Sequence, residues 1–131
     1  MLRSFDAPHE RPAPRALVGR TLDGEEVSLE LGRMTLVAAV KSHCDGCRTF
    51  LESDLAEFAN VDVVIISATQ EEEYRASQHV VIVAPDVMVE LEIRAAPFYV
   101  LIDSSTSMVV AEGSIFSPAQ VASEIAPYVV S

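Results

Sequence analysis

The chain contains two cysteines, Cys44 and Cys47, and Asp45 and Gly46 separate them. An apolar run precedes the pair and a helical pattern follows it, so a buried strand is expected to lead into a helix here. Unpaired amide N–H groups at a helix start stabilise a thiolate and lower the pKa of the first cysteine, in known proteins to about 3.5–7.5. A thiolate attacks a disulfide, and a sulfur one turn further in can close back on the first. The spacing therefore predicts a redox dithiol, with Cys44 as nucleophile and Cys47 as resolving thiol.

An alternative interpretation of the two cysteines is a pair of small core side chains, since free cysteine is commonly buried. The placement of the pair between a buried strand and a helix start favours the redox interpretation, and the neighbouring residues carry groups that would tune a thiolate. His43, when protonated, would favour the anion, whereas Asp45 would repel it while suiting the helix dipole. Lys41, the only lysine, is a candidate for proton handling at the strand end, the alternative being a solvated charge at the rim.

The other histidines, His9 and His79, show no ligand spacing, and we expect both at the surface. A metal site would need His43, Cys44 and Cys47 to supply one nitrogen and two sulfurs to zinc or copper. A closed zinc site needs a fourth ligand, and none stands out in the sequence. We therefore expect no metal and no cofactor, and keep metal handling as an alternative function.

Length and composition describe one acidic globular domain. The 131 residues and 14.2 kDa suit a single domain, and a hydrophobic fraction of 50% with 22% charged residues excludes a disordered protein. Nine Lys and Arg against 20 Asp and Glu leave a net charge of −11, which makes nucleic acid and anionic membranes poor partners. No signal-like apolar segment opens the sequence and the apolar runs are strand-sized, so we expect a soluble cytoplasmic monomer.

The elements before the cysteines are a hairpin and a buried strand. Residues 1–15 hold three prolines and no apolar periodicity, and we expect an extended arm ahead of a domain over 16–131. Residues 16–31 predict a β-hairpin, because Asp23-Gly24 supplies the positive φ angles of a tight turn between two apolar stretches. The unbroken apolar run 34–40 predicts a strand covered on both faces.

The elements after the cysteines alternate between helix and strand. Helical spacing predicts one helix from the cysteines onward, with an inner face of Cys47, Phe50, Leu51, Leu55 and Phe58. Thr69 and Glu72 predict a capping box for a short helix, and residues 61–68 and 80–84 predict buried strands on either side of it. A brief helix is expected over 86–92. The remaining segments are a strand over 98–102, a returning strand over 108–111, and a helix with Ser117 as N-cap, Pro118 at its first position and Gln120 at its third. This order predicts an α/β fold with a mixed central sheet flanked by helices and an N-terminal hairpin.

Three segments resemble the thioredoxin superfamily, in particular its TlpA-like and redoxin (AhpC/TSA-type) branch. TLDGEEVSL over 21–29 is similar to a DG-x-x-V-x-L hairpin, VKSHCDGCR over 40–48 to a W-C-x-x-C-R active site, and IRAAPFYVLID over 93–103 to V-x-x-x-P-x-x-x-L-I-D. With the element order, the resemblance covers about residues 16–129. It implies a thioredoxin-like fold and a thiol-disulfide oxidoreductase that acts on a disulfide-containing protein and is served by an upstream thiol donor.

The resemblance also implies that Pro97 is preceded by a cis peptide bond and faces the cysteines. The backbone of Ala96 would then pair with an extended substrate segment. The alternative is that Pro97 only begins an edge strand, where proline is tolerated. Two departures are clear: His43 replaces the tryptophan usual before the first cysteine, and Ala38 stands where thioredoxin has a buried acid.

Two further alternatives come from the same superfamily. A peroxiredoxin site would need Thr or Ser three residues before its nucleophile, and Lys41 holds that position relative to Cys44. A non-catalytic adaptor would use the acidic surface to bind a basic partner, with the dithiol as a remnant. Insensitivity of partner binding to replacement of the cysteines would distinguish the adaptor from the oxidoreductase.

Overall fold

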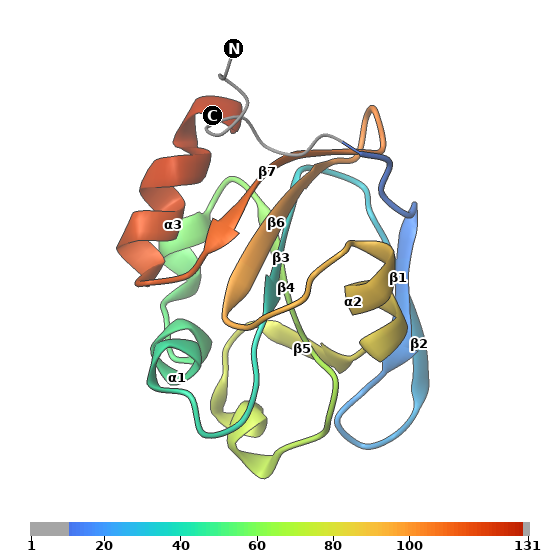
Figure 1. Cartoon of the computed structure of the whole chain (residues 1–131), viewed down its shortest axis with the longest axis vertical. Coiled ribbons are helices and arrows are strands. Elements are labelled where there is room, and N and C mark those ends of the chain that lie inside the picture. The colour runs from blue at the N-terminus through green and yellow to red at the C-terminus, as the bar shows by residue number, and fades with distance from the viewer. Residues whose placement is uncertain (1–10, 130–131) are drawn as a thin grey trace.

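A seven-stranded mixed sheet forms the centre of the protein, with strand order β2-β1-β5-β4-β3-β6-β7 (Figure 1). The computed structural model describes residues 11–129. The strands are β1 Ala16–Arg20, β2 Glu26–Glu30, β3 Thr35–Ala39, β4 Asp62–Ser67, β5 Val80–Val83, β6 Phe98–Asp103 and β7 Met108–Ser114. The helices are α1 Asp45–Leu51, α2 Pro85–Glu90 and α3 Pro118–Ile125, with short 3₁₀ helices η2 Leu55–Phe58, η3 Glu72–Ala76 and η4 Ala126–Tyr128.

Helices cover both faces of this sheet, and each face has its own core. In Figure 1 the sheet is seen from its edge, with α1 and α3 on one side and α2 on the other. Side chains of β3 alternate between the two: Leu36 and Ala38 pack toward α1 and α3, and Val37 packs toward α2. All five residues of β3 are buried, which confirms the prediction of a strand covered on both faces.

The directions of β3 and β6 bring the cysteines and Pro97 to the same end of the sheet. β3 runs parallel to β4 and antiparallel to β6, with Ala39 paired to Phe98. The end of β3 therefore lies beside the beginning of β6. The cysteine segment follows the first and Pro97 precedes the second, so Cys47 and Pro97, 50 positions apart in the sequence, lie at the same end of these strands.

The predicted N-terminal hairpin is confirmed. β1 and β2 pair antiparallel over five residues, and Gly24 in the turn has a φ of 90°, a conformation that glycine adopts without steric cost. The hydroxyl of Thr21 accepts hydrogen bonds from the amides of Asp23 and Glu25. The turn is thus closed by contacts within five residues, which is why the local sequence predicts it.

The segment before the hairpin lies along β7 where it is described. Pro12 forms a bridge with Met108, and the amide of Ala13 donates to the carbonyl of Ser107 at 2.8 Å. Arg11 is buried and pairs with Glu112 at 2.8 Å. Residues 1–10 of the expected arm, which include His9, lie outside the described residues.

The helix predicted to continue from the cysteines to Phe58 is wrong in its second half. α1 ends at Leu51, and a 3₁₀ helix begins at Leu55. The amide and hydroxyl of Ser53 both donate to the carbonyl of Phe50, and the Asp54 carboxylate accepts from the amide of Ala56. Side chains of Ser and Asp compete for backbone groups in this way and end helices.

The capping box predicted at Thr69 and Glu72 is also wrong. The residue that caps η3 is Glu71, which makes no capping hydrogen bond, and the Thr69 hydroxyl donates to its carboxylate instead. The cap predicted for the last helix is confirmed, since Ser117 accepts from the amide of Gln120 and forms a complete capping box. Within residues 11–129, no helix combines the length and apolarity that crossing a membrane would require.

Candidate active site

The two cysteines form a disulfide at the N-terminus of α1, with their Cα atoms 5.2 Å apart. Cys44 is the N-cap residue, with extended backbone geometry, and Cys47 lies in the first turn. The side chain of Cys44 is half-buried, whereas Cys47 is 1% exposed and belongs to the core beneath α1. The strand, the turn and the helix therefore place the pair where the sequence predicts it.

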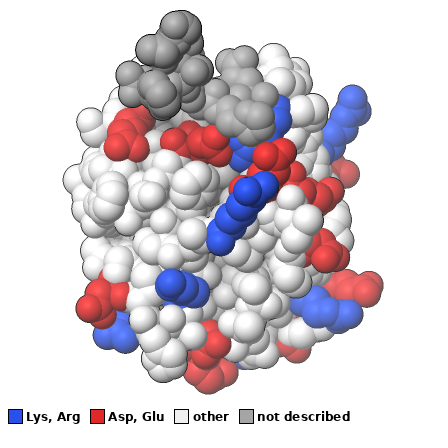
Figure 2. Space-filling view, viewed as in Figure 1, with Lys and Arg blue, Asp and Glu red and all other residues white. Residues whose placement is uncertain are grey.

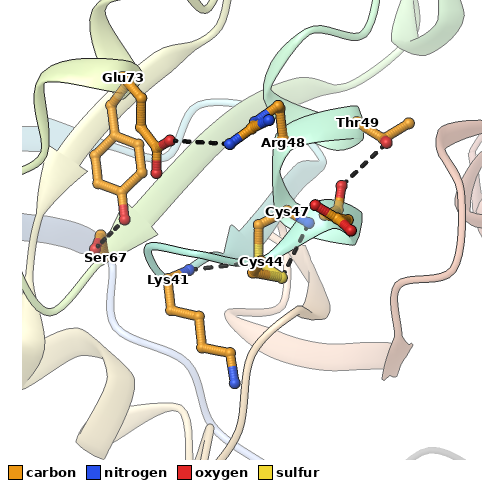
Figure 3. The surroundings of a disulfide bond; sticks show 9 residues. Lys41, Cys44, Cys47, Arg48, Thr49, Ser67 and Glu73 are labelled. Carbon is orange, nitrogen blue, oxygen red and sulfur yellow. Dashed lines mark hydrogen bonds and ion pairs between the residues drawn. A yellow bond between two sulfur atoms is a disulfide. The ribbon is translucent and has the colours of Figure 1, made fainter.

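Each sulfur is within hydrogen-bonding range of a backbone amide. The amide of Cys47 donates to Sγ of Cys44 at 3.1 Å, and the amide of Lys41 donates to Sγ of Cys47 at 3.4 Å (Figure 3). Both donors are backbone groups held by the start of the helix and the loop before it. They would stabilise negative charge on either sulfur after reduction, because a thiolate accepts such bonds more strongly than a thiol.

The three residues predicted to tune the cysteines all lie close to the pair in the sequence and are all exposed. The Lys41 side chain points away from the two sulfurs (Figure 3), so its contact with the pair runs through its backbone. His43 has a φ of 57°, in the left-handed region where histidine is more frequent than most residues. Asp45 is the acidic residue of the first helical turn.

Pro97 lies against the cysteine turn. The Ala96–Pro97 peptide bond is cis, which confirms that prediction. A Cβ atom placed on Gly46 would lie 3.5 Å from Cγ of Pro97, so even a methyl group at this position between the cysteines would touch the proline ring. β6 lies between β3 and β7, and the alternative that Pro97 opens an edge strand is therefore wrong.

The segment between β7 and α3 completes this surface, and the sequence did not single it out. The amide of Ile115 donates to the carbonyl of Pro97 at 3.2 Å, and the Ile115 carbonyl oxygen would lie 3.8 Å from a Cβ on Gly46. The next residue, Phe116, is 79% exposed. An aromatic residue directly before the Ser117 cap was the available signal, but nothing in the sequence connects it to residues 70 positions earlier.

On the other side of the pair, α1 is tied to η3. Arg48, next to Cys47, forms an ion pair with Glu73 at 3.8 Å (Figure 3). Tyr74 is buried, and its hydroxyl lies 3.1 Å from the hydroxyl of Ser67. Burial raises the pKa of Tyr74 above its ordinary value, and the hydrogen bond to Ser67 opposes the shift. The tyrosine thus serves as a neutral packing residue beneath the site.

The part of the chain that the structure describes contains no set of ligands for the metal site considered above. Over residues 11–129, no three or more side chains of His, Cys, Asp or Glu gather as a metal would require. The predicted surface position of His79 is wrong, because this residue is 6% exposed and lies within hydrogen-bonding distance of Ser53. His79 is remote in sequence from the cysteines and lies beside the C-terminal end of α1, opposite the disulfide.

Charge is distributed unevenly over the surface. Figure 2 shows one face, on which acidic and basic side chains lie mainly toward the rims and the right-hand side. Uncharged surface fills much of the left-hand middle, the side on which α1 and α3 lie in Figure 1. The net charge of −11 is therefore not spread evenly over this face.

The arrangement of the described residues matches solved structures over most of the chain. The thioredoxin domain of a thiol-disulfide oxidoreductase from Bacteroides vulgatus is 22% identical, with a TM-score of 0.67 over 92% of this chain and 96% of that one. The dsbF protein of MTB is 15% identical, with a TM-score of 0.67 over 88% and 98% of the two chains. A mitochondrial 2-cys peroxiredoxin from Plasmodium falciparum is 11% identical, with a TM-score of 0.63 over 90% and 92%.

No family model matches the chain, and no curated protein matches its sequence. The structural likenesses combine identities of 11% to 22% with nearly complete coverage, and likeness of this kind establishes architecture. In this chain that architecture carries a disulfide at the start of α1, with Pro97 beside it. The chain therefore has the thioredoxin fold, as its three sequence motifs predicted.

Proposed function

We propose that this protein is a thiol-disulfide oxidoreductase whose active group is the Cys44–Cys47 pair. The observation that carries the proposal is the position of the pair: a disulfide at the N-terminus of α1, with Pro97 packed against the turn between the sulfurs. A disulfide buried for stability alone would need neither a partly accessible sulfur nor backbone amides directed at both sulfurs. Fold likeness to named oxidoreductases supports the same class of reaction.

The difference in burial supports the proposed roles of the two cysteines. Cys44 is half-buried and Cys47 is 1% exposed, so a protein substrate reaches Cys44 first. The Cys44 thiolate attacks one sulfur of a substrate disulfide, which forms a mixed disulfide and releases the other substrate sulfur as a thiolate. Cys47, as a thiolate, then attacks Sγ of Cys44 and releases the second substrate thiolate. The two electrons come from the dithiol, which ends as the disulfide present in this structure.

An upstream dithiol would return the pair to its reduced form by the same exchange in reverse. His43 and Asp45 would set the fraction of thiolate from opposite directions, since a cation beside the sulfur favours the anion and a carboxylate opposes it. Lys41 would act chiefly through its amide, because its side chain points away from the sulfurs. The direction of net flow, reduction or oxidation of partners, follows from the potential of the pair relative to its surroundings.

The substrate would lie across Pro97. Ala96 and Pro97 are half-buried beside the cysteine turn, and the backbone of Ala96 would pair with an extended substrate segment. Phe116, on the neighbouring segment and 79% exposed, would supply an apolar contact to a substrate side chain. Removing this ring would weaken binding of the substrate without changing the reactivity of Cys44 toward a small disulfide.

Trapping of mixed disulfides tests the proposal. Cys47→Ser leaves the nucleophile without its resolving partner, so this variant should retain substrate proteins through Cys44. Cys44→Ser is the matched control and should retain none, because the remaining sulfur is buried. Equal trapping by the two variants would contradict the assignment of roles, and trapping by neither would contradict exchange with proteins. A titration of the pair against dithiothreitol or glutathione then gives its potential.

A further inference from the structure

His79 is buried at the end of α1 opposite the disulfide. Its Nε2 atom lies 2.9 Å from the hydroxyl oxygen of Ser53, and the residue is 6% exposed. The ring stacks on Phe50, with centroids 6.0 Å apart, and meets Phe58 edge-on at 6.2 Å. His79, directly before β5, therefore contacts α1 through Phe50, η2 through Phe58, and the segment between them through Ser53.

The hydrogen bonds assign the proton on this ring. Ser53 has a single hydroxyl proton, which it donates to the carbonyl of Phe50 at 2.6 Å. Its oxygen must therefore accept from His79, which places the ring proton on Nε2. Nδ1 is buried, and within residues 11–129 no polar atom pairs with it. The unprotonated Nδ1 is uncharged and needs no acceptor, whereas a protonated Nδ1 would place an N–H group there without one.

We infer that His79 is a proton-sensitive latch: its neutral Nε2–H form fastens the end of α1 to the sheet, and protonation at Nδ1 releases it. The imidazolium would bury a second N–H without a partner, and a buried unsatisfied donor is unfavourable. The latch lies outside the exchange chemistry of the cysteines. The inference therefore stands or falls separately from the proposed function.

The charged groups around the ring do not remove this penalty. Burial lowers the pKa of His79 below its ordinary value, and this outweighs the opposing effects of a hydrogen bond to the backbone of Ser53 and of the carboxylates of Asp54 and Glu57. Asp54 and Glu57 belong to the segment that caps and forms η2, and both are exposed. On the sheet side, Arg33 and Asp62 adjoin the groove that His79 lines, and they pair with each other at 3.7 Å.

The sign of the pH dependence follows from the lowered pKa. The unfolded chain binds a proton at the ordinary histidine pKa of about 6.5, whereas the folded chain resists protonation until a lower pH. The stabilisation is therefore fully present above the unfolded value and is lost as the pH falls toward the folded value. Between the two values, the unfolding equilibrium constant should rise by up to about tenfold for each pH unit.

Urea unfolding of the oxidised protein tests the latch over about pH 8 to pH 5, the range in which histidine changes charge. His79→Gln cannot take up the proton, so its stability should fall less on acidification than that of the wild type. His43→Gln is the matched control, because His43 is exposed, and it should keep the wild-type slope. Equal slopes for His79→Gln and wild type would overturn the inference.

Nitrogen-15 NMR of the wild-type imidazole rings gives a second measurement that needs no variant to fold. The expected result is a neutral His79 ring with its proton on Nε2, which persists to a lower pH than the ordinary histidine transition. A proton on Nδ1 at neutral pH, or titration at the ordinary pKa, would also overturn the inference.

Discussion

The two ends of α1 use polar groups in opposite ways. At the N-terminal end, a half-buried sulfur meets backbone amides and remains within reach of a partner. At the C-terminal end, Ser53 and His79 hydrogen-bond to each other beside a cluster of aromatic rings and are buried. The helix has only seven residues, which is too short to be stable alone. Its stability therefore depends on packing against the rest of the protein.

The largest expected effect is at the reactive end. Cys44→Ser should reduce disulfide exchange to the uncatalysed rate, because it removes the attacking sulfur. Compared with the reduced wild type, its free energy of unfolding should change by no more than about 0.5 kcal/mol, since the residue lies at the edge of the core. An insulin-type turbidity assay and urea unfolding measure the two quantities. Substantial residual exchange would mean that the two ends of α1 do not divide their roles as described.

At the anchoring end, Phe50→Ala should have the largest effect on stability. Phe50 is fully buried and contacts the rings of Phe58 and His79, so its loss should lower the free energy of unfolding by about 3–5 kcal/mol. The adjacent Thr49 is exposed, and Thr49→Ala is the matched control, expected to cost no more than about 0.5 kcal/mol. Similar losses in the two variants would show that the aromatic cluster does not anchor the helix.

Ser53→Ala should have an intermediate effect at the same end. It removes the donor to the Phe50 carbonyl and the acceptor for His79, so it should lower the free energy of unfolding by about 1–3 kcal/mol. Combined with His79→Gln, the two losses should sum to more than the double variant shows, because each residue is the partner of the other. Additive losses in a double-mutant cycle would indicate independent roles.

Asp45→Asn should have a small effect on stability. Losing the carboxylate of the first turn should cost about 0.3–1 kcal/mol of helix stabilisation. The same change should favour the Cys44 thiolate, because a nearby negative charge is removed, and alkylation of the reduced protein should become faster at mildly acidic pH. Asp45→Glu keeps the charge and is the control. Unchanged alkylation in Asp45→Asn would mean that this carboxylate does not tune the sulfur.

Features that depend on contacts within a few residues could be predicted from the sequence. The hairpin turn at Asp23-Gly24, the Ser117 cap and the position of the cysteines at a helix start all belong to this class. The same reasoning failed at Thr69, where a suitable capping pattern was present but its side chains bond elsewhere. A local pattern states what the backbone can do, and the surrounding packing selects among the possibilities.

The sequence by itself determined the chemistry available to this protein, because a dithiol needs only two sulfurs at short spacing beside free backbone amides. It also indicated the strand–helix order, since apolar periodicity follows the period of each element. Tertiary structure alone decided that Ile115 joins Pro97 at the site and that His79 is a buried partner of Ser53. The two pairs are 18 and 26 residues apart in the sequence, and only the closure of the sheet and the packing of helices on its faces bring them within hydrogen-bonding distance.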